Sequence, residues 1–168
     1  SRYRPPRGSD GYDGQMADKT QGAPQPSGQR PPFSPVIALL TVSAVWDARL
    51  NAALKDLGLT TRKYGLLAHV QATPGISFSE LARRSQITVQ TAHTAVKTLA
   101  GEGLVEDATA HAGAASDLRV TAKGAAALAE ADARLAALDE VFGAGVPALS
   151  SALHGLHEQP FGEILQQD

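Results

Sequence analysis

Apolar and polar positions repeat with a helical period most clearly between Ile76 and Val105, in two short segments joined by a tight turn. The second segment has an apolar seam at spacings i, i+3, i+4 and i+7, formed by Ala92, Ala95, Val96 and Leu99. The opposite face repeats that spacing with polar side chains, at Gln90, His93, Thr94 and Lys97. A helix held by such a seam while presenting hydrogen-bonding groups suits the major groove of DNA. The alternative is an ordinary solvated face in an all-helical domain.

Local signals predict further helices around this pair. Apolar spacing favours a helix over about 36–57 that stops at Gly58, and Thr60 is a suitable N-cap for a second helix that ends before residues 74–75. Ser77 and Glu80 form a capping box for a third helix beginning at about 78.

Beyond the third helix, the chain continues as a fourth helix, a short hairpin and two more helices. Thr88 caps the fourth helix and Gly103 follows its end. Residues 104–106 and 118–121 are predicted to pair as strands around a small, flexible tip. An Ala-rich helix is expected from Lys123, and a last helix over about 147–165.

Residues 1–35 differ from the rest because they are rich in proline and glycine and show no period of 2 or 3.6. Their composition predicts a disordered N-terminal tail. The only methionine, Met16, is one candidate for the natural first residue.

Composition narrows the class of protein. A chain of 168 residues without cysteine excludes disulfides, thiolate zinc sites and cysteine nucleophiles. We find no apolar run that approaches the roughly 18 residues of a membrane span. The net charge of −2 hides an asymmetry, because residues 60–125 hold seven Lys or Arg against five acids, whereas residues 126–168 hold one Arg against seven. These features predict a soluble cytoplasmic protein with a mildly basic middle, which is compatible with DNA binding.

Four short blocks, taken in order, make the chain similar to the MarR (multiple antibiotic resistance regulator) family of bacterial winged-helix transcription factors. The blocks are GLT at 58–60, SELA at 79–82, TVQTAHTAVKTLAGEGLV at 88–105 and VTAKG at 120–124. The resemblance implies a mainly α fold with a small β-hairpin wing, in which a winged helix-turn-helix domain (58–124) lies between N- and C-terminal dimerisation helices (36–57 and 125–168). It also implies a homodimer that binds double-stranded DNA at a palindromic operator.

The resemblance assigns DNA contacts to named positions. The side chains expected to face DNA are Ser79, Gln90, Thr91, His93, Thr94 and Lys97, with Thr88 capping the reading helix toward a phosphate. Arg62 and Lys63 would approach the backbone, and Arg119 lies at the base of the wing. Each of these is otherwise an ordinary solvated side chain.

Two departures from the family pattern weaken the expected DNA affinity. Many relatives carry arginines at the positions of Thr94 and Thr98, and an Asp and Arg pair is common near the wing tip, where this chain has residues 112–115 as Ala, Gly, Ala, Ala. An arginine in a narrow minor groove is attracted by the negative potential there. We therefore expect weak binding unless other cations or a protein partner compensate.

Ligand chemistry is also implied by the resemblance, because relatives commonly bind small aromatic or phenolic anions between the dimerisation helices and the reading domain. Trp46, Arg49, Tyr64 and His69 would supply stacking surface, a cation and a titratable donor. The competing interpretation makes Trp46 and Tyr64 plain core residues and Arg49 part of an interface ion pair.

We find no catalytic motif, so an enzyme is not expected, and no cofactor is predicted. His154, His157 and Glu158 share a helical face, but such residues near an acidic C-terminus are more often simply solvated than metal-bound. The prediction is a homodimeric repressor released by a small organic ligand. The alternative is a degenerate winged-helix dimer that acts mainly through protein contacts.

Overall fold

The computed structural model describes residues 28, 30–111 and 113–158. It divides the chain into two units, Ser1–Ser34 and Pro35–Asp168, and the fold below is that of the second unit. The predicted disordered tail, 1–35, lies mostly outside the described residues, and its last residue, Pro35, begins the first helix.

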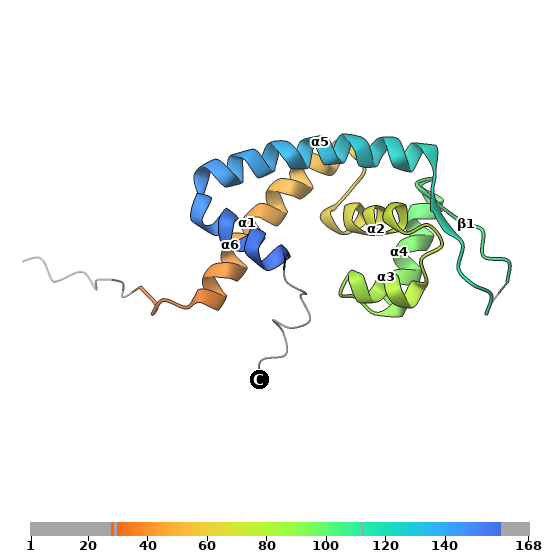
Figure 1. Cartoon of the computed structure of the whole chain (residues 1–168), viewed down its shortest axis with the longest axis horizontal. Coiled ribbons are helices and arrows are strands. Elements are labelled where there is room, and N and C mark those ends of the chain that lie inside the picture. Colours follow the sequence, from red (N-terminus) through yellow and green to blue (C-terminus); the bar gives the residue numbers. More distant parts are fainter. Residues whose placement is uncertain (1–27, 29, 112, 159–168) are drawn as a thin grey trace, which may run out of the picture. The chain divides into compact units, whose positions relative to one another are not determined.

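The second unit is mainly helical with one small hairpin, as predicted (Figure 1). Its elements are α1 (Pro35–Leu54), the 3₁₀ turn η1 (Lys55–Leu57), α2 (Thr61–Ala72), α3 (Phe78–Arg84), α4 (Val89–Gly101), β1 (Val105–Asp107), β2 (Leu118–Val120), α5 (Ala122–Gly145) and α6 (Pro147–His157).

Hydroxyl N-caps determine where four of the helices begin. Thr60 Oγ1 accepts from Lys63 N at 3.2 Å, and Ser77, Thr88 and Thr121 make the equivalent bond to the residue three positions on. The first three caps were predicted from the sequence. Only half of the predicted capping box forms, because the Glu80 carboxylate accepts hydrogen bonds from Arg83 and Arg84.

Several boundaries differ from the sequence prediction by a few residues. The first α-helix ends at Leu54, and the chain tightens into η1 before Gly58 turns it with a positive φ of 69°. The first strand begins at Val105 and the second ends at Val120. The helix predicted to reach 165 ends at His157, and residues 159–168 lie outside the described residues.

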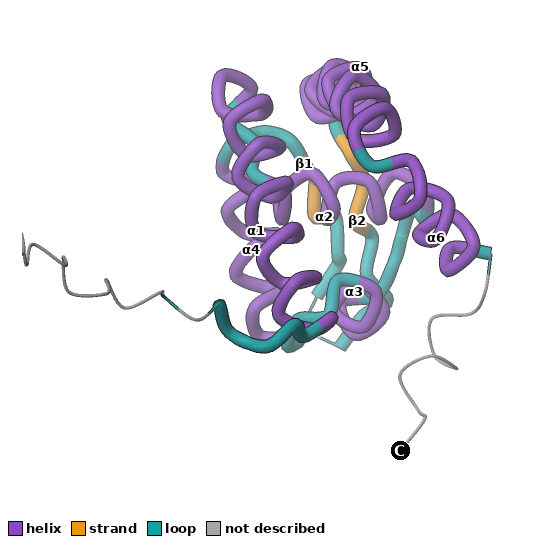
Figure 2. The backbone as a smooth tube through the Cα atoms, turned by 90° about the vertical axis from the view of Figure 1, so that its left-hand side faces the viewer, coloured by secondary structure: helices purple, strands orange, loops and turns teal. Residues whose placement is uncertain are grey.

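The hydrophobic core lies between α2, α3, α4, the hairpin and part of α5. Its fully buried side chains include Leu66 and Leu67 from α2, Leu81 from α3, Leu99 from α4 and Leu118 from β2. The strands pair antiparallel, with Val105 opposite Val120 (orange in Figure 2). This core gives α4 and the wing a common support.

Helix α5 joins the hairpin to the last helix and passes over α1 and α2 (Figure 1). Its start is tied to the hairpin, because Thr121 Oγ1 donates to Gly103 O at 2.6 Å and Thr121 N donates to Leu104 O at 3.1 Å. Farther along, Arg134 donates to Ala53 O at 2.6 Å. The helix is therefore anchored at the wing and again at the end of α1.

Most of α1 is not buried within the described part of the chain. Only Leu54 among its 20 residues is buried, while Val36, Ile37, Leu39, Leu40 and Val45 are exposed. The segment Pro35–Leu57 is long and apolar enough to cross a membrane by length and composition, and its most apolar stretch is not buried. The expectation that no stretch approaches that length was therefore wrong, because small and uncharged residues fill the gaps between its large apolar ones.

Candidate nucleic-acid interface and ligand pockets

Helix α4 presents two chemically different faces. Ala92, Val96 and Leu99 are buried, which confirms the apolar seam. On the other side, the exposed residues Gln90, His93, Thr94 and Lys97 line a groove that also includes Phe78 and Asp107. Because Asp107 is the last residue of β1, the groove extends from the polar face of α4 to the end of this strand in the wing.

Within this groove the side chains differ in how free they are. The imidazole of His93 stacks on the ring of Phe78, with centroids 3.8 Å apart and planes inclined by 21°. Thr94 Oγ1 donates to Gln90 O at 3.1 Å. Among the described residues, no hydrogen bond engages the side chains of Gln90 and Lys97. These two groups are the most available for a bound partner.

Polar residues also surround the N-terminal turn of α4. Thr88 Oγ1 accepts from Thr91 N at 3.1 Å and lies 2.8 Å from Thr91 Oγ1. Both threonines line a shallow concavity with Arg62 and Arg83. Ser79 is exposed in the first turn of α3. The free N–H groups and partial positive charge of a helix N-terminus, with two guanidinium groups near it, suit a phosphate.

Two predicted DNA contacts are instead engaged inside the protein. Lys63 Nζ lies 2.7 Å from Glu102 Oε1, which joins α2 to the end of α4. Arg119 projects outward from β2, as strand alternation predicted, but its Nε lies 2.8 Å from Asp117 Oδ1. Both cations are at least partly neutralised, so we leave Lys63 out of the proposed interface and treat Arg119 as a weak contributor.

The wing offers few cations of its own. Its strands and their flanks carry Glu106, Asp107 and Asp117 against the single Arg119. Asp107 Oδ1 accepts from Thr109 N at 3.1 Å, which shapes the turn toward the tip. Of the small residues expected at the tip, Ala112 lies outside the described residues. The acidic balance of the wing disfavours close approach to phosphates.

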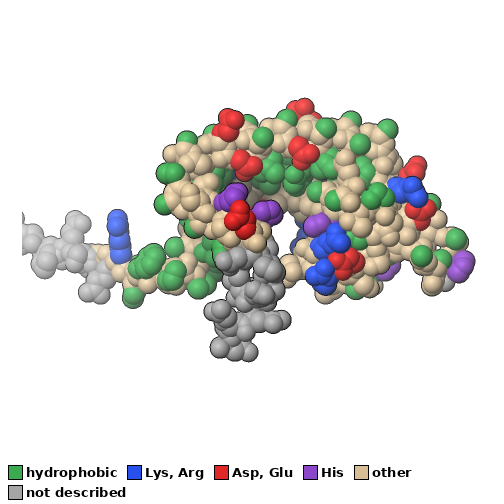
Figure 3. Space-filling model, in the orientation of Figure 1, with side chains coloured by type: hydrophobic (Ala, Val, Ile, Leu, Met, Phe, Trp, Pro, Cys, Tyr) green, Lys and Arg blue, Asp and Glu red, His purple; other side chains and the backbone are tan. Residues whose placement is uncertain are grey.

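The surface shows the charge asymmetry that the sequence predicted, with acidic side chains concentrated on the C-terminal part of the chain. In Figure 3, acidic side chains follow the upper edge, where α5 runs and carries Glu130, Asp132, Asp139 and Glu140.

Glu80 is held between Arg83 and Arg84, whose guanidinium groups lower the pKa of its carboxyl to about 2. That carboxylate stays charged at neutral pH and offsets part of the basic charge on α3.

The four predicted ligand residues do not meet in one cleft. Trp46 lines an apolar pocket of about 450 Å³ formed by α1, α5 and α6. Phe142 meets the Trp46 ring edge to face with centroids 5.0 Å apart, and Arg49 lies 4.6 Å from the centroid of that ring.

Tyr64 is used structurally instead. Its hydroxyl donates to Asp132 Oδ1 at 2.7 Å, which connects α2 to α5. Burial and this carboxylate raise the pKa of Tyr64 to about 12. The phenol is therefore neutral at physiological pH, and its hydroxyl is used in a contact between two helices.

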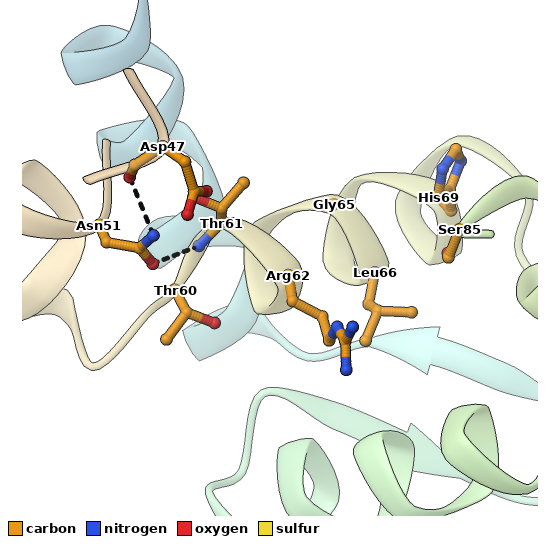
Figure 4. A pocket seen from close by; sticks show the side chains of 9 residues that line it. All are labelled: Asp47, Asn51, Thr60, Thr61, Arg62, Gly65, Leu66, His69 and Ser85. Atoms are coloured by element: carbon orange, nitrogen blue, oxygen red, sulfur yellow. Dashed lines mark hydrogen bonds between the residues drawn. The ribbon is translucent and has the colours of Figure 1, made fainter. Parts of the chain in front are cut away.

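His69 lines a second pocket, which is polar and has a volume of about 440 Å³ (Figure 4). The other residues around it come from α1, α2 and the end of α3: Asp47, Asn51, Thr60, Thr61, Arg62, Gly65, Leu66 and Ser85. Most of these were missed by sequence reasoning, because residues from three separate helices share no local spacing.

The candidate metal residues on α6 do not gather into a site. His154 Nδ1 lies 3.7 Å from Glu158 Oε1, and both side chains are largely exposed. Among residues 28, 30–111 and 113–158, no group of three or more potential His, Asp or Glu ligands is found.

Comparison with known proteins gives consistent matches. A family model described as MarR family matches residues 57–113. The HTH-type transcriptional repressor Rv2887 of Mycobacterium tuberculosis is 34% identical over 102 residues, which cover 60% of this chain and 73% of the repressor. A solved structure of Rv2887 in complex with DNA has a TM-score of 0.61 at 28% identity and covers 75% of this chain and 97% of that one. Its complex with p-aminosalicylic acid has a TM-score of 0.60 at 28% identity, covering 75% and 98%.

Proposed function

The chain belongs to the MarR family of winged-helix transcriptional regulators, and on this basis we propose that it represses transcription as a homodimer on a palindromic operator and is released by a small organic ligand. Members of this family are DNA-binding proteins and not enzymes. The alternative, a dimer that acts mainly through protein contacts, is not favoured by a set of relatives that includes a named repressor and a DNA complex.

The observation that carries this proposal is the exposed face of α4. A buried seam holds the helix against the core, so the side chains of Gln90 and Lys97 stand clear of the domain. In this proposal, α4 enters the major groove, where the Gln90 amide reads a base edge and Lys97 neutralises a phosphate. Arg62 and the Thr88 turn lie where a neighbouring phosphate is expected.

Dimer formation through residues 36–57 and 125–168 is supported by the uncovered apolar face of α1 and by the apolar pocket it shares with α5 and α6. Pairing with a second copy would bury the exposed apolar side chains that make α1 resemble a membrane-spanning helix in composition. We also propose that residues 58–124 form the DNA-binding domain and that the protein acts in the cytoplasm.

For the ligand, we propose an aromatic acid seated beside Trp46. The apolar pocket provides a ring partner in Trp46, and Arg49 next to it provides a cation. Calorimetric titration of the whole protein with salicylate tests this assignment. Arg49→Gln should weaken binding, and unchanged affinity in that variant would exclude the site.

The function itself is tested by unbiased selection of DNA sites with the full chain. We expect a two-fold symmetric sequence whose half-sites lie about one helical turn apart, bound by a dimer in light scattering. Salt-sensitive binding without sequence preference would favour the protein-interaction alternative. A folded monomer at micromolar concentration would refute the homodimer.

A further inference from the structure

An aromatic side chain lies in the groove beside the polar face of α4. Phe78 is the first residue of α3, directly after the N-cap Ser77, and its side chain packs partly against the hydrophobic core. It also lines the groove that contains Gln90, His93 and Lys97. Helices α3 and α4 lie side by side (Figure 1). Phe78 is therefore supported by the core and reaches the surface that is proposed to read DNA.

The contact between Phe78 and His93 is a face-to-face stack. The ring centroids lie 3.8 Å apart and the planes are inclined by only 21°, whereas the Trp46 and Phe142 rings meet at 82°. Stacking covers a face of the imidazole and leaves its edge open, and both ring nitrogens lie on that edge. His93 remains exposed, and within the described part of the chain no hydrogen bond or ion pair engages its nitrogens. The imidazole is therefore held in orientation while its hydrogen-bonding groups stay available.

The position of His93 on α4 places it between two proposed DNA contacts. Gln90 lies three residues before it and Lys97 four residues after it, so the three side chains share one face of the helix. These separations correspond to about 4.5 Å and 6 Å along the helix axis. Asp107 lines the same groove from β1, but its Oδ1 accepts from Thr109 N at 3.1 Å and makes no hydrogen bond to the imidazole. Because Gln90 is proposed to read a base and Lys97 to neutralise a phosphate, an imidazole between them is expected to reach a base edge.

We propose that Phe78 is a positioning residue for DNA reading: its ring holds the His93 imidazole edge-on to the major groove, where a ring N–H donates to N7 of a purine. A neutral imidazole carries one N–H donor, and both purines present the N7 acceptor in that groove. A pyrimidine presents its C5 position instead, which accepts no hydrogen bond and carries a methyl group in thymine. Fixing the ring before binding removes an entropy loss that a freely rotating side chain would incur. This role rests on the proposed DNA-binding function and adds to it a purine preference at one position of each half-site.

Matched operators test this role on the full chain. Site selection with the wild type and with His93→Ala identifies the base pair that His93 reads, and this pair is then inverted in both half-sites. The wild type should prefer the original operator by at least about five-fold, and His93→Ala should lose that preference. Phe78→Leu keeps the imidazole and an apolar side chain but removes the flat ring, so the preference should fall by about two- to ten-fold. Phe78→Met serves the same purpose if the leucine variant does not fold.

Two controls separate positioning from a general effect on the fold. Adding Phe78→Leu to His93→Ala should change the preference no further, because Phe78 acts through His93. Leu57 packs on the same core but does not line the groove, so Leu57→Ala should lower resistance to urea while leaving the preference unchanged. The stack itself is measured by NMR without DNA. The ring C–H signals of His93, assigned by their loss in His93→Ala, should lie upfield of the other histidine signals and lose that shift in Phe78→Leu, because the phenyl ring current shields them.

The possible failures are distinguishable. Unchanged base preferences in a folded Phe78→Leu or Phe78→Met protein would overturn the positioning role and leave the repressor function intact. His93 signals without an upfield shift in the wild type would overturn the stack on which this role depends. If the wild type selects no operator, the DNA-binding function itself is refuted, and the role of Phe78 with it.

Discussion

Replacing Gly124 by alanine tests how the DNA-binding domain is joined to α5. Gly124 is the third residue of that helix, directly against the root of the wing. A Cβ at this position would lie 2.8 Å from Val120 Cγ1 and 3.0 Å from the carbonyl carbon of Leu104, and closer still to the Leu104 carbonyl oxygen. Ordinary carbon contacts are about 3.5–4.0 Å. Helix and hairpin would have to separate by about 1 Å.

The cost follows from what that separation breaks. Overpacking against rigid backbone costs about 1–3 kcal/mol. The bonds from Thr121 N to Leu104 O and from Thr121 Oγ1 to Gly103 O span the same gap, and each is worth about 1 kcal/mol. Alanine has a higher helix propensity than glycine, which offsets about 1 kcal/mol of this loss in stability. The net loss is about 2–4 kcal/mol, a large share of the roughly 5–15 kcal/mol that stabilises a domain.

Urea unfolding followed by circular dichroism measures this loss directly. Gly65→Ala is the matched control, because Gly65 is also helical but has open space around its Cα, and it should gain about 0.5–1 kcal/mol. Gly124→Ala should also weaken DNA binding, because the wing moves relative to α4. A Gly124→Ala protein as stable as Gly65→Ala would refute the close approach described here.

Three further predictions concern the reading surface and its support. Gln90→Ala should relax base preference and cost about 1–3 kcal/mol of DNA-binding free energy. Lys97→Ala should weaken binding to all DNA sequences alike and reduce the slope of log affinity against log salt by about 1. If neither variant changes operator binding, α4 does not read the operator. Ala114→Arg should steepen the salt slope by about 0.9 per wing and favour A·T-rich flanks, as measured by titration at two salt concentrations, and equal slopes would show that the tip does not reach DNA. Tyr64→Phe should lose about 1 kcal/mol at neutral pH. Because the pKa of Tyr64 is raised to about 12, the wild-type stabilisation is complete below pH 10 and is lost toward pH 12, so only the wild type should show that loss in alkaline urea titrations.

Sequence reasoning succeeded where the physical cause is local. The caps at Thr60 and Thr88 act on a residue three positions away, and the seam of α4 is a repeat within a single helix. These features depend on spacing that can be read directly from the chain. Helix type, order and approximate bounds were therefore predictable.

Contacts between distant segments were not predictable from such spacing. Lys63 pairs with Glu102, 39 residues away, and His93 rests on Phe78 from another helix. The polar pocket needs α1, α2 and α3 to be placed together before Asp47 and Ser85 share a cavity. Gly124 was recognised only as part of a family block, and its physical reason became visible once Leu104 was placed against it.

Because α1 has an exposed apolar side, the lifetime of the folded chain should depend on its cellular concentration. In the proposed homodimer, a newly synthesised copy keeps this helix uncovered until it meets another, and during that time it is open to proteases and chaperones. Because association depends on concentration, the fraction of chains in this vulnerable state rises as the cellular level falls. As the rate of synthesis of this protein falls, the occupancy of its operator would therefore fall more steeply than that rate. This would sharpen the threshold at which the controlled genes are expressed.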